Sequence, residues 1–158
     1  MCWESGGSAT RRKVFSDYKA NRAPLRVKRN DVYEDAKDSK ENFNTQLQFL
    51  ANALKNTPIR QMYIPDCEAD DVIGYLAKYQ LENRNVIIAS SDKDFYQLVS
   101  DRVKIYSPTK KKIITKDDII EEYNIHPNNF VTARTFVGDS SDNIPGIKGI
   151  GLKTMAKR

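Results

Sequence analysis

Three short stretches of the sequence gather carboxylates: residues 67–72 (Cys-Glu-Ala-Asp-Asp-Val), 91–94 (Ser-Asp-Lys-Asp) and 138–143 (Gly-Asp-Ser-Ser-Asp-Asn). Their seven acids are Glu68, Asp70, Asp71, Asp92, Asp94, Asp139 and Asp142. Like charges that are held close together repel one another strongly unless a cation gathers them. Hard oxygen donors in this number, with no histidine among them, suit Mg²⁺ or Mn²⁺ rather than Zn²⁺. The composition of these stretches therefore predicts a site for divalent cations.

The first stretch lies at the start of an expected helix. Apolar residues follow the acids at helical spacing, which predicts an amphipathic helix from Ala69 to Tyr79. Glu68, Asp70 and Asp71 then stand at its N-terminus, where the helix dipole favours negative charge. The alternative is that these acids only cap the helix, although one acid is enough for capping.

The second stretch follows an expected strand. Residues 85–90 form a short apolar run between helical patterns, which is typical of a buried parallel strand. Asp92 and Asp94 come directly after it, at the sheet edge where ligands bind in open α/β folds. The alternative is a solvated turn that caps the next helix, expected from Phe95 to Val99.

Composition limits the classes of protein that the chain can belong to. With 158 residues, a net charge of +5 and a pI near 9.1, it reads as a soluble globular protein of about one domain with a polyanionic partner. We find no internal repeat, no secretory signal and no apolar run of membrane-spanning length, so we expect no membrane partner. Cys2 and Cys67 have no zinc or disulfide spacing, and we expect reduced thiols in the cytoplasm.

The N-terminal region is rich in cations. Arginines and lysines between residues 11 and 22 alternate with Phe15 and Tyr18. Cations bind phosphates and aromatic rings stack on bases, so the pattern favours single-stranded nucleic acid. The alternative is a solvated basic face. Residues 25–38, which follow, contain too few apolar side chains to pack into a core.

The remaining periodicity predicts alternating helices and strands, hence an α/β fold. Strands are expected at 2–4, 62–64, 102–107 and 112–114, and helices at 39–55, 115–123, 128–137 and 152–158. Ser39 and the pair Thr115 and Asp118 are expected caps, and His126 is an expected N-cap or surface residue. Gly138 is expected to close the helix that ends at Val137.

A glycine-rich stretch, 145–151, precedes the last helix. Glycines allow backbone N–H groups to approach a phosphate at the start of a helix. The alternative is a glycine-rich turn between two helices.

The three acidic stretches, in this order and spacing, resemble the 5′-nuclease family: the phage 5′-3′ exonucleases or flap endonucleases and the 5′-nuclease domain of bacterial DNA polymerase I. The match consists of Glu-Ala-Asp-Asp at 68–71, Asp-Lys-Asp at 92–94, and the run from Gly138 to Gly151. The resemblance implies a PIN-like, Rossmann-related α/β nuclease domain at 1–114 with an arch region at 24–45. It also implies the start of a helix–three-turn–helix, a helix–hairpin–helix-like DNA-binding region, at 115–158.

The resemblance also implies roles for individual residues. Residues 16–24 look like the family's Tyr-Lys-x-x-Arg segment, so Lys19 and Arg22 would act on the scissile phosphate as catalytic residues. Tyr18 would stack on a base, Arg11 would contact DNA, and Glu4 stands where the family has a metal-binding aspartate. The implied cofactors are two Mg²⁺ or Mn²⁺ ions, one held by Glu68, Asp70, Asp71 and Asp92, the other by Asp92, Asp94, Asp139 and Asp142. Implied contacts to duplex DNA come from Gly146, Lys148, Gly149, Gly151 and Lys153, with K⁺ at the 146–151 hairpin.

The implied activity is metal-dependent hydrolysis of DNA at 5′ single-strand/duplex junctions, including RNA-primed hybrids, in primer removal, replication or repair. The enzyme would be a monomer when complete, in the cytoplasm of a bacterium or phage-infected cell. The family's first strand, with its Asp-Gly ligand, has no counterpart here, so we expect a part of a longer or split enzyme. Two alternatives remain open: a non-catalytic structure-specific DNA-binding protein, and a PIN-type ribonuclease.

Overall fold

The computed structural model describes residues 1–4, 7–22 and 40–156. Most of the expected arch region, 24–45, lies outside the described residues, as does the expected cap Ser39. The described part runs as β1 (Cys2–Trp3), α1 (Ala9–Val14), α2 (Lys40–Leu54), β2 (Met62–Tyr63), α3 (Ala69–Tyr75), η1 (Leu76–Gln80), β3 (Val86–Ala89), η2 (Lys93–Leu98), β4 (Val103–Ser107), β5 (Lys112–Ile114), α4 (Lys116–Tyr123), η3 (Pro127–Asn129), α5 (Phe130–Val137), η4 (Ser140–Asp142) and α6 (Leu152–Met155).

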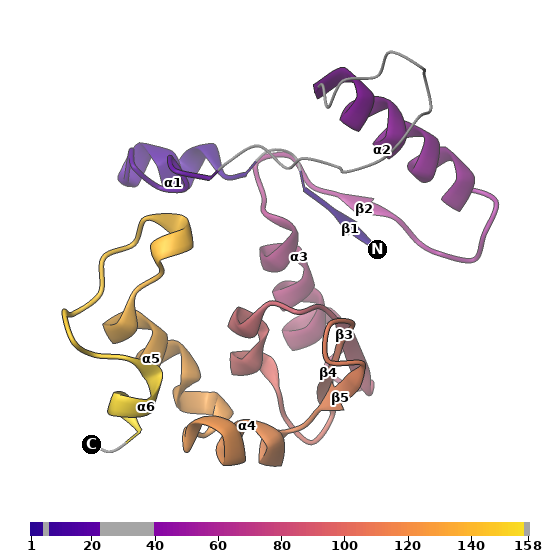
Figure 1. Ribbon diagram of the computed structural model, residues 1–158. Coiled ribbons are helices and arrows are strands. Elements are labelled where there is room, and N and C mark those ends of the chain that lie inside the picture. Colours follow the sequence, from indigo (N-terminus) through magenta and orange to yellow (C-terminus); the bar gives the residue numbers. More distant parts are fainter. Residues whose placement is uncertain (5–6, 23–39, 157–158) are drawn as a thin grey trace.

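The strands form two small sheets, which confirms the expected α/β class. β1 and β2 pair in parallel, and β3 pairs in parallel with β4, which pairs antiparallel with β5. Figure 1 shows β1, β2 and α2 at one end of the molecule, and α5 and α6 at the other. α3 links the two ends, because it starts below β2 and descends to the larger sheet.

The expectation that residues 85–90 form a buried strand is only partly correct. Ile88 is buried, but Ile87 is 62% exposed. Successive side chains of a strand point to opposite faces, so in β3 only one face packs on the core while the other is left uncovered. An uninterrupted apolar run in the sequence carries no signal for that difference.

The core lies between the larger sheet and the helices that follow it. Tyr96, Tyr123 and Phe130 form an aromatic triad with ring centroids 5.3–6.0 Å apart. Offset and edge-to-face ring pairs of this kind stabilise a core beyond their buried area. The same cluster contains Ile105 from β4 and Ile119 from α4, so it draws on both sides of the expected boundary at residue 114. That boundary stays a prediction.

Several expected caps are present. Thr115 and Asp118 form a capping box at the start of α4, and hydrogen bonds from Lys112 and Thr115 lower the pKa of Asp118 to about 2. The His126 side chain accepts a hydrogen bond from Asn128 N–H, and Gly138 ends α5 with φ +74°. The guanidinium of Arg102 donates to the carbonyls of Ala77 and Leu81, which closes the end of the α3–η1 segment.

Other parts of the chain differ from expectation. The helix expected from Ala69 to Tyr79 is α-helical only to Tyr75 and continues as one π-helical turn. α1 was not expected. The Ser8 side chain caps it by accepting from Arg11 N–H, and Asp66 accepts from Ala9 N–H and Thr10. Both cysteines are free thiols. None of the helices in the described ranges combines the length and apolar content needed to cross a bilayer.

Candidate metal centre

The first carboxylate group consists of Glu68, Asp70 and Asp71, at the start of α3. One ligand oxygen of each lies within 4.8 Å of the others. Glu68 occupies the N-cap position, yet its side chain makes no capping hydrogen bond. It is 1% exposed, whereas Asp70 is half-buried and Asp71 is exposed. Capping therefore does not explain why Glu68 is buried.

The segment that follows α1 supplies the partners of Glu68. Lys19 Nζ lies 2.8 Å from Glu68 Oε2, and Tyr18 Oη donates to the same oxygen at 3.0 Å. Arg11 pairs with Glu68 through Nη1 and with Asp71 through Nη2. Burial raises the pKa of Glu68, but the hydrogen bonds from Lys19 and Tyr18 outweigh it, so the net direction is down. Glu68 is thus held as a carboxylate.

One atom of this group has no partner in the described part of the chain. Glu68 Oε1 is buried and makes no hydrogen bond to any described residue. A buried carboxylate oxygen without a partner is costly, and a divalent cation supplies the missing interaction. Burial, followed by the charges of Asp71 and Glu68, raises the pKa of Asp70. The group therefore fits a hard cation: it offers several oxygens, one of them unsatisfied, and repulsion that a positive ion would relieve.

The second carboxylate group consists of Asp94, Asp139 and Asp142. Asp94 lies in η2 after β3, and the other two follow the end of α5. Arg134, on α5, joins the first two: its Nε lies 2.9 Å from Asp94 Oδ1, and its Nη2 lies 2.7 Å from Asp139 Oδ2. Burial raises the pKa of Asp94 despite Arg134, whereas hydrogen bonds from Ser141 outweigh burial and lower the pKa of Asp139.

The turn from Asp17 to Arg22 connects the two groups. While Lys19 reaches Glu68, its backbone N–H donates to Asp142 O at 3.0 Å, and Arg22 pairs with the Asp142 carboxylate. Lys19 has φ +58°, a left-handed conformation that turns the chain at this point. The two residues expected to be catalytic therefore lie beside different carboxylate groups.

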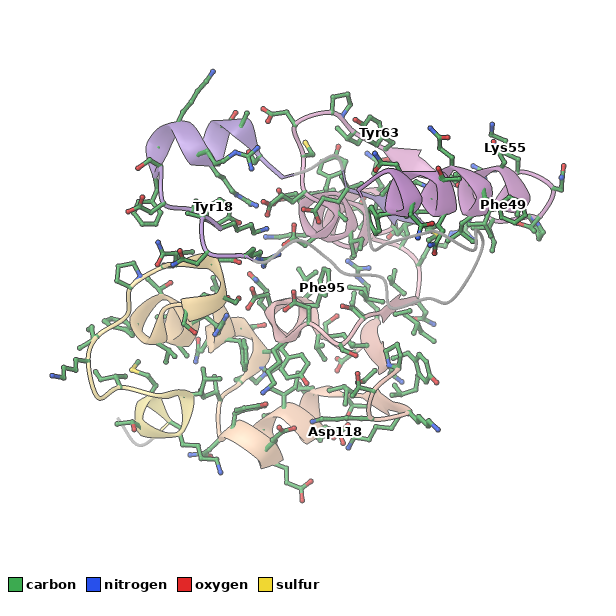
Figure 2. The ribbon with its side chains drawn as sticks, turned by 45° about the horizontal axis from the view of Figure 1, so that its top comes forward. Tyr18, Phe49, Lys55, Tyr63, Phe95 and Asp118 are labelled. Atoms are coloured by element: carbon green, nitrogen blue, oxygen red, sulfur yellow. The ribbon has the colours of Figure 1, made fainter. Side chains whose placement is uncertain are left out.

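A single cavity of about 1050 Å³ opens onto both groups. Its walls include Asp70 and Asp71 from the first group and Asp94, Asp139 and Asp142 from the second. Arg11, Tyr18 and Arg134 line it as well. Figure 2 shows Tyr18 on the segment after α1; its hydroxyl points to Glu68 at the start of α3. The cavity thus combines carboxylates that could hold cations with arginines, paired to those carboxylates, that could bind an anion.

Three expected ligands lie outside this cavity lining: the buried Glu68, and the exposed Asp92 and Glu4. Asp92 is exposed, and its Oδ1 accepts from Asp94 N–H at 2.9 Å, so it caps η2. This is the alternative that the sequence left open for the second stretch. Glu4, after β1, is exposed, and its charge acts on Arg22. Their roles as ligands stay predictions.

The expected DNA contacts from Gly146 to Lys153 lie away from the cavity lining. Gly146 has a packing reason to be glycine, because a Cβ there would lie 1.9 Å from the carbonyl oxygen of Val137. Gly149, with φ +83°, and Gly151 face open space, and Lys148 and Lys153 are exposed. All five residues are exposed, so a ligand can reach each of them.

Sequence reasoning missed two residues of the site. Arg134 was expected only to pack or make contacts, although a cation in the last turn before Gly138 and Asp139 was a usable signal. Gly7 has φ +85°, and a Cβ on it would lie 3.4 Å from Glu68 Oε1. Nothing in the local sequence distinguished it from an ordinary loop glycine.

Comparison with known proteins shows the family of the chain. A family model described as the N-terminal resolvase-like domain of 5′-3′ exonucleases matches residues 1–124. The chain is 37% identical to a 5′-3′ exonuclease of Buchnera aphidicola over 98% of its own length and 49% of that protein. It is 38% identical to the thermostable DNA polymerase I of Thermus thermophilus over 99% of its length and 17% of the polymerase.

Solved structures show the same fold. A bacteriophage T5 5′-exonuclease with bound zinc ions superposes with a TM-score of 0.75 at 26% identity, over 99% of this chain and 57% of that one. A bacteriophage T5 flap endonuclease in complex with DNA and metal ions gives a TM-score of 0.74 at 26% identity, over 99% and 57% of the two chains. The chain spans about half the length of the exonuclease relative. It belongs to the family of 5′-3′ exonucleases and carries their N-terminal resolvase-like domain.

Proposed function

We propose that this domain hydrolyses phosphodiester bonds of DNA at 5′ single-strand/duplex junctions, as a 5′-3′ exonuclease or flap endonuclease. The observation that carries the proposal is the buried Glu68, whose Oε1 has no hydrogen-bond partner among the described residues. It lies beside Asp70 and Asp71, which line a cavity together with the cations Arg11 and Arg134. The related T5 structures contain divalent metal ions, and one contains DNA.

The proposed ligand sets follow the two groups. Glu68, Asp70 and Asp71 would hold one Mg²⁺ or Mn²⁺ ion, and Asp94, Asp139 and Asp142 the other. Such ions, when bound, lower the pKa of water and stabilise charge on attacking and leaving oxygens. We leave Glu4 and Asp92 out of the direct ligands because both are exposed and lie outside the cavity lining.

The chain's own cations would bind the phosphate. Lys19 and Arg22 lie at the two carboxylate groups, so a phosphate between the groups meets a positive charge on each side. Arg11 and Tyr18 line the same cavity and would contact the strand next to that phosphate. Fixed cations aimed at a phosphate that gains negative charge stabilise its transition state.

Duplex DNA would bind at the accessible part of the 145–153 stretch. The backbone N–H groups around Gly149 and Gly151, with Lys148 and Lys153, would contact phosphates, with K⁺ between the hairpin carbonyls and the DNA. Such contacts fix the position of the duplex without reading its sequence. They would orient the junction towards the cavity.

Cleavage of a 5′-labelled flap with Mg²⁺ or Mn²⁺ tests the proposal. The full chain is compared with Glu68→Gln and with the control Glu122→Gln, since Glu122 also lies 2.8 Å from a lysine but outside the cavity. We expect cutting near the junction by the full chain and the control only. Flap binding without cutting would indicate a DNA-binding protein without chemistry, and cutting confined to RNA strands would indicate a ribonuclease.

A further inference from the structure

The cavity continues past the carboxylates along one face of α3 and η1. Tyr75, Lys78 and Tyr79 line it together with Asp71. Four residues of α-helix rise about 6 Å, so Tyr75 lies one turn beyond Asp71 and Tyr79 roughly one turn further. We call Tyr75, Lys78 and Tyr79 the aromatic wall. It extends the metal centre in one direction, on the surface of a single element.

The aromatic wall is not part of the core. Tyr75 and Tyr79 are 54% and 56% exposed, and their ring centroids lie 5.4 Å apart. Lys78 Nζ lies 5.6 Å from the centroid of the Tyr79 ring. Two exposed rings and a cation form a surface that is apolar in its faces and positive at its edge. None of these side chains pairs with an acid among the interactions of the described residues.

The opposite side of the cavity is also suited to a flat apolar ligand. Val14 and Phe15, on and after α1, line it and are exposed, Val14 by 86%. Gln97 from η2 and Thr135 from α5 supply polar groups. A nucleic-acid strand presents flat bases on one side and phosphates on the other. Exposed aromatics with interspersed cations bind single strands in this way, without sequence preference.

We propose that the aromatic wall binds the unpaired strand of the junction as it leaves the metal centre, with Tyr75 and Tyr79 against bases and Lys78 at a phosphate. The inference rests on the proposed function, because the metal centre fixes where the strand begins. Continuity of the cavity from Asp71 to Tyr79 is the reason to assign a nucleic acid rather than a peptide. The wall would then add affinity for tailed over blunt substrates.

Binding of two labelled DNA duplexes in EDTA tests the proposal, one blunt and one with an unpaired 5′ tail of about six nucleotides, within the range that single-strand sites cover. The double variant Tyr75→Ala/Tyr79→Ala should bind the tailed duplex about tenfold or more weakly. Binding of the blunt duplex should change by less than about twofold. The double Tyr→Phe variant should keep the tail preference, because stacking needs the ring and not the hydroxyl.

The matched control is Tyr63→Ala. Tyr63 is 57% exposed, close to the wall tyrosines, but it lies in β2 outside the cavity lining. Lys78→Gln should reduce the salt slope of tailed-duplex binding by about 0.7. The proposal is overturned if the alanine double variant, with an unchanged melting temperature, keeps the tail preference, or if Tyr63→Ala loses it equally. Tail binding by a chain that cuts no substrate would refute the proposed function and leave this inference standing.

Discussion

The two carboxylate groups of the candidate metal centre are built in different ways. In the first, Glu68 is 1% exposed and receives Lys19, Tyr18 and Arg11 from a single N-terminal segment. In the second, the side chains of Asp94 and Asp139 are 41% and 21% exposed and share the single cation Arg134. A buried carboxylate depends on its protein partners alone, whereas a more exposed one is stabilised by water as well. The first group is therefore preformed, and the second is adjustable.

This contrast predicts an order of binding. An ion at the first group meets oxygens already held in place and satisfies Glu68 Oε1, for which the described residues offer no hydrogen bond. An ion at the second group has to displace Arg134 from Asp94 and Asp139. We expect the first group to bind Mn²⁺ more tightly than the second.

Glu68→Gln should have the largest effect. The amide keeps the volume but removes the charge that Lys19 and Arg11 neutralise. Lys19, whose side chain is 11% exposed, is then left without its acid. We expect flap cleavage to fall about 10²-fold or more, the scale of losing one charged group at a reacting centre. Asp94→Asn should lower the cleavage rate about tenfold, because water and Arg134 also stabilise the charge at that position. Equal losses of cleavage rate in the two variants, measured in initial-rate assays, would contradict the proposed difference between the two carboxylate groups.

Arg134→Gln should change stability in a way that depends on metal. Without metal, Asp94 and Asp139 lose the cation that offsets their repulsion, so the melting temperature should fall by about 2–4 °C per kcal/mol lost. Added Mn²⁺ should restore most of that loss. The control is Arg102→Gln, which removes hydrogen bonds to Ala77 O and Leu81 O away from the cavity. The fall in melting temperature of the Arg102→Gln control, measured by calorimetry, should be equal with and without Mn²⁺.

The pH dependence of stability should differ between the acids of the candidate metal centre and the acids elsewhere in the fold. The pKa values of Asp70 and Asp94 are raised by burial first, so these acids take up protons at higher pH than ordinary aspartates. Their contribution to metal-free stability is gained as pH falls and lost as pH rises through the raised pKa values. Mn²⁺ affinity should move in the opposite direction, falling as pH falls, because the ligands must be deprotonated.

Asp118, which lies outside the candidate metal centre, serves as the control for these pH measurements. Its pKa is lowered to about 2, so its stabilisation is present above its ordinary pKa and lost as pH falls through the lowered one. Unfolding midpoints measured from about pH 2 to pH 7 should show this loss at the acid end. Asp118→Asn should remove it without changing Mn²⁺ affinity. A shift of Mn²⁺ affinity in Asp118→Asn would contradict the assignment of the titrating ligands.

Lys110→Gln should have the smallest effect. Lys110 lies 2.8 Å from Glu122, the same distance as Lys19 from Glu68, but this pair is exposed on the surface. Exposed ion pairs contribute about 0–1 kcal/mol, so its melting temperature should scarcely change. Lys19→Gln should cost more because it leaves Glu68 buried with one partner fewer. Equal shifts in the two variants would show that burial is not what distinguishes the first group.

The sequence contained much of the fold and the general location of the centre. Thr115 with Asp118, and Gly138 after Val137, are local signals whose physics needs no tertiary context, and both are present in the structure. The acids of the candidate site could be predicted because they cluster at the ends of the expected helices and strands. Asp92 shows the limit: two positions from Asp94, it caps η2 instead of facing the cavity, and only the backbone direction decides this.

Arg134 and Gly7 show a second limit. Arg134 pairs with Asp94, 40 positions earlier in the chain, as well as with Asp139, and Gly7 lies close to Glu68, which is far from it in the sequence. Such contacts depend on how helices and strands pack together, and they produce no periodic pattern in the sequence. The open face of β3 at Ile87 was missed for the same reason, since an apolar run has the same composition whether one face or both are covered.

The most direct test of the central claim is a crystal soaked at increasing Mn²⁺ concentration, with sites located by anomalous scattering. We predict a first peak bounded by Glu68, Asp70 and Asp71 at low Mn²⁺. A second peak at Asp94, Asp139 and Asp142 should appear only at higher Mn²⁺, with Arg134 withdrawn from Asp94. A first peak at the second group, or saturating Mn²⁺ with no peak at either group, would contradict the account.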